Sequence, residues 1–387
     1  MPRIGKCAIA GLGVTGMGRI YGRDAADFAA EAIKLALADA GLKKEELDGL
    51  LINSGISPGL DLSLQNVLGL RDLKLLNHMN AWGSTAEAMV QFAAMAVHAG
   101  MANVVACVFA DAPLTPSRSA GEAYGAYVDA TGMASLLPAY GYYGINVGYA
   151  LAARRHMHLY GTTSRQLGAI AVAQRAWAVM NPLAQMRKPM TIEDHQNSRF
   201  IVEPLRLLDC CLVSNGGVAV IVTSAERAKS LTQPPVYILG MGQGHPGADN
   251  RSGWEPRIRT GAVIAKEAAF TTAGISIADI DICELYDCYT YAVLVTLEDY
   301  GFCKKGDGGP FVEDGKLGPG GSLPTNTGGG QLSAFYLWGM TPLSEAVIQT
   351  RGQAGERQVK KHDVVLVSGN GGIFDYHSTL VLSTQPS

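Results

Sequence analysis

A turn before a helical pattern is the first place in this sequence where chemistry would be expected. In HMNAWGSTAEAM, residues 78–89, a Gly-Ser-Thr turn runs into an Ala- and Met-rich helical pattern. A strand-to-helix turn of this kind often presents a nucleophile. The residue at its tip, however, is Trp82, and an indole is neither a nucleophile nor a base. We therefore expect Trp82 to be structural, as a plug or a wall of a pocket.

Two tyrosines at turns in the second part of the chain could move protons, because a phenol can donate or accept one. Tyr286 follows the strand-like run ICEL, and Tyr336 follows the loop NTGGGQ, which begins at Asn326. The run SGNGG leads into Gly371 and Gly372, whose turn could offer backbone N–H donors to an oxyanion. Each has a structural alternative. Tyr286 lies among other tyrosines, Tyr336 lies in an apolar run where aromatic side chains usually pack in a core, and Asn326 suits a tight loop.

Other polar candidates are better explained by structure than by catalysis. Asp287 could orient a tyrosine, but we expect it to cap the helix that starts there. We expect Cys288 to be a small buried thiol. The pair Cys210–Cys211 is expected in the core. His245 lies in a loop and is not expected to be catalytic, and His377 is expected to be a satisfied histidine at the start of a strand.

Composition limits the possible partners. The 387 residues are 48% hydrophobic and only 17% charged, which is enough apolar material for a large core. The formal net charge is −3 and no Lys/Arg cluster is visible, so we do not expect nucleic acid as a partner. No apolar run reaches the roughly 18–20 residues that a membrane span needs. Seven cysteines without framework spacing or a CxxC pair predict reduced thiols in a cytoplasmic protein and no metal site.

An internal repeat organises the elements that must position these residues. AIKLALADAGLKKEELDGLLINSG near the start and AVIAKEAAFTTAGISIADIDICELYD far downstream share one order: a helical pattern, a glycine, an aspartate and an apolar strand. Gly41 precedes Asp48 by seven residues, and Gly274 precedes Asp281 by seven residues. Each glycine suits a helix C-cap. The alternation of strands and helices predicts a layered α/β fold that is duplicated.

The domain organisation follows from this repeat. We predict an N-terminal half at 1–234 and a C-terminal half at 235–387. Residues 112–208 do not fit the rhythm and are predicted to be an inserted lid or interface region within the first half. Its tyrosines between 124 and 149 could form a flat apolar pocket for a ring system or pack in an interface.

The stretch from YGTTSRQLGAIAV to DCCLVSNGGVAVIV closely resembles the middle of thiolases of the sterol-carrier-protein type. The resemblance covers nearly the whole chain. It implies the thiolase fold, two similar α/β halves packed in five layers (α-β-α-β-α) with an inserted loop domain. It also implies a homodimer, and a substrate held as a coenzyme A thioester.

The catalytic motifs depart from that family at every position. Trp82 stands where thiolases have the nucleophilic cysteine, and Tyr286 stands where the sterol-carrier type has the histidine of a His-Asp-Cys-Phe motif. Tyr336 occupies the position of the histidine that activates the nucleophile, and the last thiolase cysteine falls at about Ser368. Claisen cleavage needs a thiolate that forms an acyl-enzyme. Ordinary thiolase activity is therefore not expected.

The tyrosine pair instead resembles that of the thiolase-like aldolases of bacterial steroid side-chain degradation. This resemblance implies retro-aldol cleavage of a β-hydroxyacyl-CoA, with Tyr286 and Tyr336 as base and proton donor in an order that the sequence leaves open. It implies no cofactor in this chain and a small zinc-ribbon and OB-fold partner that gives a heterotetramer. Two alternatives remain: a thiolase-type acyltransferase with Cys288 as nucleophile, and a non-catalytic acyl-CoA or lipid-binding subunit.

Overall fold

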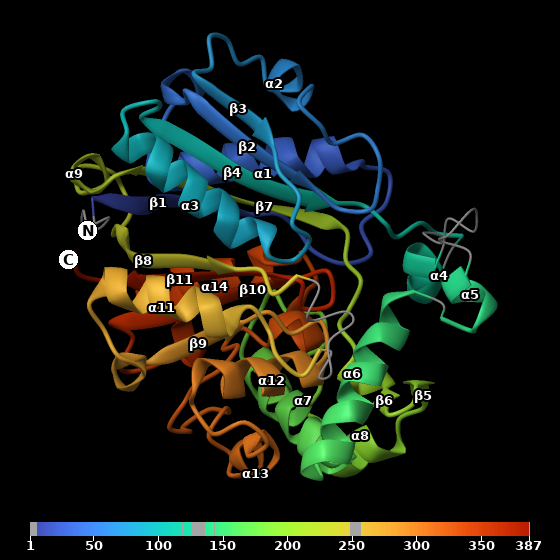
Figure 1. The fold of residues 1–387 in the computed structure, drawn as a ribbon. Helices are drawn as coiled ribbons and strands as arrows, with labels where there is room; N and C mark the ends of the chain where they lie inside the picture. Colours follow the sequence, from blue (N-terminus) through green and yellow to red (C-terminus); the bar gives the residue numbers. More distant parts are fainter. Residues whose placement is uncertain (1–5, 118, 126–135, 143, 248–256, 387) are drawn as a thin grey trace.

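The computed structural model describes residues 6–117, 119–125, 136–142, 144–247 and 257–386 (Figure 1). Tyr127 and Tyr143, which belong to the tyrosine-rich stretch of the insertion, lie outside the described residues. In Figure 1 the N-terminal half is blue and cyan apart from its last, yellow-green strand and helix, the C-terminal half runs from yellow to red, and the mostly green insertion lies beside the C-terminal half. No helix among these residues combines the length and the apolar character that a membrane crossing requires.

The first half is built on five strands, which lie in the order β3-β2-β4-β7-β1. β2 is parallel to β3 and to β4, whereas β7 runs antiparallel to β4 and to β1. β4 and nearly all of β7 are buried, as the near-continuous apolar runs in their sequences predict. The elements are β1 (Cys7–Val14), α1 (Ala25–Ala40), β2 (Gly49–Ser54), α2 (Leu64–Val67), β3 (Leu75–His78), α3 (Thr85–His98), β4 (Val104–Asp111), β7 (Gly216–Ser224) and α9 (Ala225–Ala228).

The second half repeats this order in reverse along the sheet, as β8-β11-β10-β9. β9 is parallel to β10, and β11 runs antiparallel to β10 and to β8. Thr325 forms a parallel bridge with Cys283 at the place where β3 lies in the first half. The elements are β8 (Val236–Gly244), α11 (Ala262–Ala273), β9 (Ile282–Leu285), α12 (Thr290–Tyr300), α13 (Gly308–Glu313), α14 (Met340–Thr350), β10 (Val364–Gly371) and β11 (Tyr376–Ser383).

The helices complete five layers. α1 packs on the outer face of the first half's strands, and α11 packs on β8 and β11. α3 and α14 lie between the halves: α3 packs against β4 and β7 on one side and against β10 and β11 on the other. α14 is buried almost throughout, and ten of the 14 residues of α3 are buried. β1 and β8 also pair over Ala8–Ile9 and Val236–Tyr237, so the strands of both halves form one nine-stranded sheet.

The predicted repeat has a physical basis in both halves. Gly41 and Gly274 end α1 and α11 in the left-handed conformation, with φ of 73° and 70°. Asp48 accepts hydrogen bonds from the N–H groups that begin β4, including that of Val104 at 2.8 Å. Asp281 does the same for β10, accepting from Val364 N–H at 3.0 Å. Asp48 therefore aligns β2 with its parallel neighbour β4, and Asp281 aligns β9 with its parallel neighbour β10.

The predicted boundary between the halves lies in the segment between β7, which ends at Ser224, and β8, which begins at Val236. The insertion packs chiefly on the other half: α7 contacts α12, α13 and the glycine loop. Its elements are α4 (Ala120–Gly125), α5 (Leu136–Ala139), α6 (Ile145–Tyr160), α7 (Ser164–Val179), α8 (Ile192–Asn197), β5 (Phe200–Val202) and β6 (Leu205–Arg206).

Candidate active site

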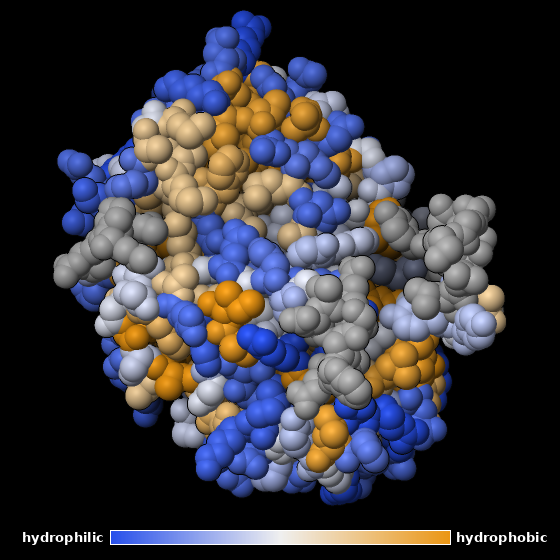
Figure 2. Space-filling model, in the orientation of Figure 1, coloured by the Kyte–Doolittle hydropathy of each residue, from blue (hydrophilic) through white to orange (hydrophobic). Residues whose placement is uncertain are grey.

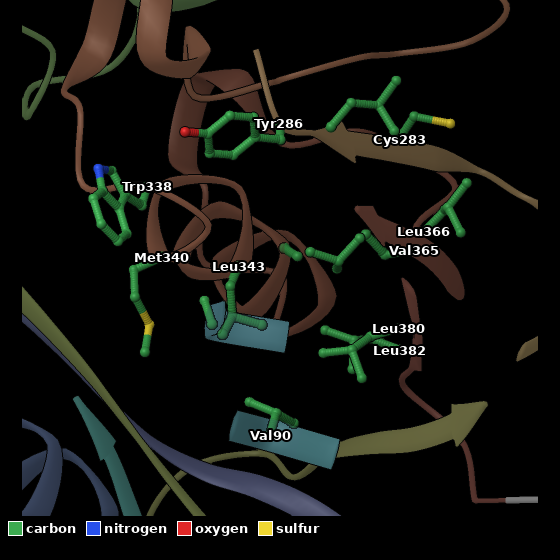
Figure 3. Close-up of a cluster of buried hydrophobic side chains, with 14 of the residues drawn as sticks. Val90, Cys283, Tyr286, Trp338, Met340, Leu343, Val365, Leu366, Leu380 and Leu382 are labelled. Atoms are coloured by element: carbon green, nitrogen blue, oxygen red, sulfur yellow. The ribbon is translucent and has the colours of Figure 1, made fainter. Parts of the chain in front are cut away.

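Tyr286 is the residue that directly follows β9. Its N–H donates to the carbonyl of Ser368 at 2.8 Å, which continues the parallel pairing of β9 with β10 for one more residue. Its ring lies against the turn before α3, because a Cβ on Gly83 would be 2.2 Å from two of the ring atoms. Only glycine permits so close an approach. Figure 3 shows the hydroxyl of Tyr286 pointing toward the side of the cluster where Trp338 lies.

Tyr336 is carried by the glycine loop that precedes α14. Residues Gly330–Ala334 of this loop form one turn of π-helix, a rare conformation that is frequent at functional sites. The insertion holds the loop, since Asn181 Nδ2 donates to the carbonyl of Gly328 at 2.7 Å and Gln185 N–H donates to that of Ala334 at 3.0 Å. The N–H of Tyr336 donates to Ser214 Oγ at 3.0 Å.

The structure brings the two predicted tyrosines together. The hydroxyl oxygens of Tyr286 and Tyr336 are 3.1 Å apart and share a hydrogen bond. Burial raises the pKa of both phenols well above the ordinary value, and the mutual proximity of ionisable neighbours adds to the shift. Both tyrosines are therefore neutral at physiological pH. A neutral pair can accept a proton at one oxygen while it gives one up at the other.

Asn326 is held by the strand that leads to Tyr286. Its Oδ1 accepts from Leu285 N–H at 2.7 Å, and its Nδ2 donates to the Leu285 carbonyl at 3.0 Å. Its backbone has a positive φ of 51°, which asparagine tolerates better than most residues. The side chain of Asn326 thus bonds the backbone of the last residue of β9, directly before Tyr286, as a neighbouring strand would. A contact with substrate stays a prediction.

Asp287 does not cap α12, and that prediction was wrong. The N-cap of α12 is Tyr289, and no side chain caps it. The carboxylate of Asp287 instead accepts from the N–H of Gln331 at 2.9 Å and of Leu332 at 3.3 Å. Burial raises the pKa of Asp287 to about 7, while these hydrogen bonds act in the opposite direction. Asp287, adjacent to Tyr286 in sequence, therefore fixes the π-helical turn that leads to Tyr336.

Trp82 lies in one of two matching turns. Residues 81 and 83 bridge around Trp82, and residues 337 and 339 bridge around Trp338, with φ of 53° and 48° at the two tryptophans. The turns precede α3 and α14, which occupy equivalent places in the two halves. The ring centroids of the tryptophans are 5.6 Å apart. Trp82 is 37% exposed and Trp338 is buried, so the pair forms a wall that runs from the surface to the tyrosines.

The two turns share a sequence pattern. AWGST at 81–85 and LWGMT at 337–341 have Trp, Gly and Thr at the same spacing. The threonines close both turns, because Thr85 Oγ1 accepts from Ala81 N–H at 2.7 Å and Thr341 Oγ1 accepts from Leu337 N–H at 3.0 Å. This shared pattern predicts the second turn, and the repeat of helices and strands alone does not include it.

Gly371 and Gly372 lie beside the Trp82 turn. A Cβ on Gly371 would be 2.1 Å from the carbonyl oxygen of Ala81. Gly372, Ile373 and Phe374 follow in the left-handed region, with φ of 61°, 57° and 72°. A positive φ is strained for a β-branched residue such as Ile373, and strain of this kind clusters at functional sites. Whether their N–H groups bind an oxyanion stays a prediction.

The two candidate histidines, His377 and His245, have the surroundings of structural residues. His377 is buried; its Nδ1 is 2.7 Å from Asn370 Oδ1 and its Nε2 is 2.9 Å from the Tyr300 hydroxyl, and burial lowers its pKa to about 3. The expectation of a satisfied histidine is confirmed. His245 is exposed and contacts Gln243 Oε1 at 3.1 Å.

The cysteines carry no activated thiolate. Burial raises the pKa of the Cys288 thiol, so it stays protonated, which confirms the buried thiol and removes the activation that a nucleophile requires. Cys210 and Cys211 are half-buried at the edge of the core, and burial raises the pKa of both. Among the residues placed by the structure, no cluster of three or more His, Cys, Asp or Glu side chains could hold a metal ion.

Comparisons with known proteins agree with this geometry. A family model described as thiolase C-terminal domain-like matches residues 246–384. A steroid side-chain-cleaving aldolase of Thermomonospora curvata is 38% identical over 95% of this chain and 96% of its own length. This chain belongs to the thiolase superfamily. The predicted thiolase fold, two similar halves in five layers, is thereby confirmed.

Two further relatives of this thiolase-like protein are informative. A 17-hydroxy-3-oxo-4-pregnene-20-carboxyl-CoA lyase of Mycobacterium tuberculosis is 38% identical over 95% of this chain and 97% of its own length. The solved structure of an Ltp2-ChsH2(DUF35) aldolase superposes with a TM-score of 0.87 at 38% identity, covering 98% of both chains. The thiolase-like protein thus aligns over nearly its full length with proteins named as aldolase and lyase.

Proposed function

We propose that this protein is a thiolase-like aldolase, a carbon–carbon lyase that cleaves a β-hydroxyacyl-CoA by a retro-aldol reaction. The substrate is a coenzyme A thioester with a steroid side chain, and the products are a ketone or aldehyde and acetyl- or propionyl-CoA. Full-length similarity to an aldolase and a lyase named for steroid substrates supports this assignment. The observation that carries it is the hydrogen-bonded pair of Tyr286 and Tyr336 at 3.1 Å, opposite a turn that has Trp82 in place of a nucleophile.

The pair can carry the reaction without a persistent charge on the enzyme. One tyrosine accepts the proton of the β-hydroxyl while its own proton passes to the second tyrosine, and the second gives its proton to the α-carbon. The O–H electrons form the new C=O bond, and the electrons of the broken Cα–Cβ bond form the new C–H bond. Each tyrosine gains one proton and loses one, so the enzyme is unchanged.

This relay agrees with the raised pKa of both phenols. A free phenolate as base would be scarce at pH 7, because burial disfavours the charged form of Tyr286 and Tyr336. A relay uses the neutral form, which is fully populated. Backbone N–H groups near Gly371 and Gly372 are the candidates for stabilising the thioester enolate as it forms. Coenzyme A enters as part of the substrate, and we propose no other cofactor for this chain.

We also propose a homodimer with a small zinc-ribbon and OB-fold partner, which together make a heterotetramer. The related solved aldolase is a complex whose name has two components, which supports a partner. β3 is an edge strand of the sheet, and such an edge can pair with another chain. Figure 2 displays an apolar area over β3 and α3, where Met95 and Met101 are about half exposed at 48% and 52%. The seven free thiols support a reducing, cytoplasmic location.

The assay that tests the function is cleavage of a β-hydroxyacyl-CoA with a steroid side chain, without added free coenzyme A. The chain is measured alone and with a zinc-ribbon partner encoded nearby. We expect a ketone or aldehyde and a short acyl-CoA as products. Tyr286→Phe and Tyr336→Phe should each lower kcat by about 10²–10⁴-fold, which is the usual contribution of a general acid or base. Tyr140→Phe is the matched control, because Tyr140 is 89% exposed.

Two other outcomes would replace the proposal. Cleavage of a β-ketoacyl-CoA that requires free coenzyme A and leaves a trappable acyl group on Cys288 would indicate a thiolase. Binding of the thioester without turnover in any combination of chains would indicate a non-catalytic acyl-CoA or lipid-binding subunit.

A further inference from the structure

Glu87 carries a carboxyl group that is completely buried between the two halves. It lies in the first turn of α3. Among the described residues, neither carboxyl oxygen of Glu87 has a hydrogen-bond partner. A carboxylate without a partner is far more costly to bury than a neutral carboxylic acid. Burial raises the pKa of Glu87 well above its ordinary value, while its own backbone N–H acts in the opposite direction. The group is therefore protonated at physiological pH.

The matching position in the second half is a leucine. Trp82 and Trp338 occupy equivalent turns, and five residues after each tryptophan come Glu87 in α3 and Leu343 in α14. Leu343 is fully buried and belongs to the cluster of apolar side chains in Figure 3. The fold thus accepts an apolar side chain at this place. Packing alone does not explain the carboxyl of Glu87.

The first turns of the two central helices differ at the same place. In α14, the N–H of Leu343 donates to the carbonyl of Gly339 at 3.2 Å. The equivalent bond from Glu87 to the carbonyl of Gly83 is not among the hydrogen bonds of the described residues, and α3 begins one residue later than α14 relative to its turn. Gly83 is buried, so its carbonyl needs another donor.

The carboxyl of Glu87 lies where it can supply that donor. A Cβ on Gly339 would be 2.6 Å from the Gly83 carbonyl oxygen and 2.7 Å from Glu87 Oε2. A Cβ on Gly369 would be 2.8 Å and 2.1 Å from the same two oxygens, so these oxygens are neighbours. Two acceptors side by side repel, whereas a protonated carboxyl has one O–H that can donate to the carbonyl.

The neighbours of Glu87 lead to both tyrosines of the proposed site. Gly83 is the residue against which the ring of Tyr286 lies, since a Cβ there would be 2.2 Å from two ring atoms. Gly339 follows Tyr336 by three residues, in the turn that leads into α14. A hydrogen bond from Glu87 to Gly83 therefore fixes a backbone segment that supports one tyrosine beside the segment that carries the other.

We propose that Glu87 is a positioning residue, whose protonated carboxyl donates to the Gly83 carbonyl and so holds the Trp82 turn against Tyr286. This inference rests on the proposed aldolase function and adds to it a residue that acts through the backbone. The carboxyl takes part in no chemical step. It keeps the phenol of Tyr286 at the distance from Tyr336 that the proton relay requires.

The test compares two variants of similar size. Glu87→Gln keeps an N–H donor for the Gly83 carbonyl, whereas Glu87→Leu copies position 343 and removes the donor. We expect Glu87→Leu to lower kcat about tenfold, the factor that loss of one oriented hydrogen bond gives, and Glu87→Gln to stay within about threefold of the wild type. KM should change less than about twofold in both. Leu343→Met, a volume-conserving change at the equivalent place, is the control and should leave kcat unchanged.

Protonation of Glu87 has two readouts that need no turnover. The infrared spectrum at pH 7 should contain the C=O band of a protonated carboxylic acid, and the difference between the wild type and Glu87→Gln isolates the contribution of this group. The second readout is stability. Because the pKa of Glu87 in the folded protein lies above its unperturbed value of 4.5, its contribution to stability falls as the pH rises above that value. The melting temperature of Glu87→Gln relative to the wild type should therefore increase between about pH 5 and pH 8.

Other titratable groups near α3 do not obscure this comparison. Those on the elements that pack against α3 are Cys7, Cys107, Asp111, Glu345, Tyr376 and His377. Glu87 also acts on Tyr300 of α12, whose pKa burial raises. All of them are present in both the wild type and Glu87→Gln, so the difference between the two proteins reports the carboxyl of Glu87.

Three results would overturn the inference. They are equal losses of kcat in Glu87→Gln and Glu87→Leu, a loss in Leu343→Met as large as that in Glu87→Leu, and absence of the infrared difference band together with a melting difference that is constant with pH. Absence of cleavage by the wild-type assembly would instead refute the aldolase function. The infrared and melting measurements would still decide whether Glu87 is protonated, so the two failures are distinguishable.

Discussion

At the scale of single residues, the site differs from a thiolase in the kind of proton chemistry that it can support. A cysteine nucleophile needs a neighbouring base that holds its proton. The resemblance to thiolases puts the indole of Trp82 and the phenols of Tyr286 and Tyr336 at three of the four catalytic positions. An indole does not ionise in the pH range of a cell, and burial raises the pKa of both phenols. The reaction proposed above needs only the transfer of protons between neutral hydroxyls.

Restoring the nucleophile alone should therefore not restore thiolysis. We expect Trp82→Cys to show no coenzyme A-dependent cleavage of acetoacetyl-CoA, because Tyr336 cannot deprotonate a thiol as a histidine does. The thiol should react with iodoacetamide at pH 7 as slowly as an ordinary cysteine, which labelling kinetics would measure. Rapid labelling together with thiolysis would contradict this view of Tyr336.

The dependence of the rate on pH separates a neutral relay from a phenolate base. We expect the single-turnover rate of cleavage to stay within about twofold between pH 7.5 and 9.5, because the neutral phenols remain fully populated below their raised pKa. A phenolate base would instead make the rate rise about tenfold per pH unit over this range. Titration of Asp287, whose pKa burial raises to about 7, extends into the lower end of this range, so the comparison is made between pH 8.5 and 9.5 as well.

At the scale of elements, the two tyrosines depend on supports that lie far from them in sequence. Asn326 pins the end of β9 through Leu285, and Asp287 pins the π-helical turn through Gln331 and Leu332. These contacts cross between the strand and the loop in both directions. A loop side chain thus fixes the backbone before Tyr286, and the side chain of Asp287 fixes the backbone before Tyr336. Together these contacts set the distance between the two hydroxyls.

Removal of the Asp287 carboxylate should loosen this arrangement. We expect Asp287→Ala to lower the free energy of unfolding by about 1–3 kcal/mol, because it leaves buried N–H groups without acceptors. It should lower kcat by more than it raises KM, since the tyrosines shift while the rest of the binding surface remains. Chemical denaturation and steady-state kinetics on the same preparation would measure both. Asp314→Ala is the matched control, because Asp314 is an exposed carboxylate that directly follows α13 and pairs only with Lys316 Nζ at 2.6 Å among the contacts described for it.

The same carboxyl should impose a slope on stability with pH. Its folded-state pKa of about 7 lies above the value of 3.8 for an unperturbed aspartate, so the folded protein binds this proton more tightly than the unfolded chain. The contribution of Asp287 to stability therefore falls as the pH rises from about 4 to 7 and is constant above that. Asp287→Asn should flatten this part of the profile of melting temperature against pH. A wild-type profile and an Asn variant profile that run parallel would argue against the raised pKa.

The duplicated layout could be predicted from the sequence, whereas the contacts that join the two tyrosines could not. Gly41, Asp48, Gly274 and Asp281 predicted the duplicated layout because each acts through local chain geometry or through a neighbouring strand of its own half. The partner of Asp287 was not predictable in this way, because it lies 44 residues further along in a turn of π-helix that no periodicity signals. The tyrosines were found by resemblance to a motif, and their separation of 3.1 Å required the fold.

At the scale of the whole molecule, the two halves are held together by extensive packing as well as by the chain that connects them. α3 and α14 pack between them, β1 pairs with β8, and α7 of the insertion packs on α12 and α13. A half cut from the rest would expose a large part of the buried central layer to water.

We therefore expect the chain to unfold in a single cooperative transition. Calorimetry should give one peak whose calorimetric and van't Hoff enthalpies agree, and the intrinsic tryptophan fluorescence should change at the same temperature. A fragment of residues 1–234 should not fold stably, because its insertion would lack the surface on which α7 packs. Two resolved transitions, or a fragment with a cooperative melt of its own, would show that the halves are independent.

The packing of the insertion on the opposite half has a consequence for recombination between relatives. Residues 112–208 are continuous with the first half along the chain, yet Asn181 and Gln185 hold the loop that carries Tyr336, and Tyr124 faces that tyrosine directly. A crossover placed at the boundary near residue 234 would join an insertion from one parent to a loop from the other. Chimeras that keep the insertion and the C-terminal half from the same parent, with breakpoints near residues 111, 208 and 234 instead of one near 234, are the ones in which substrate preference would be inherited intact.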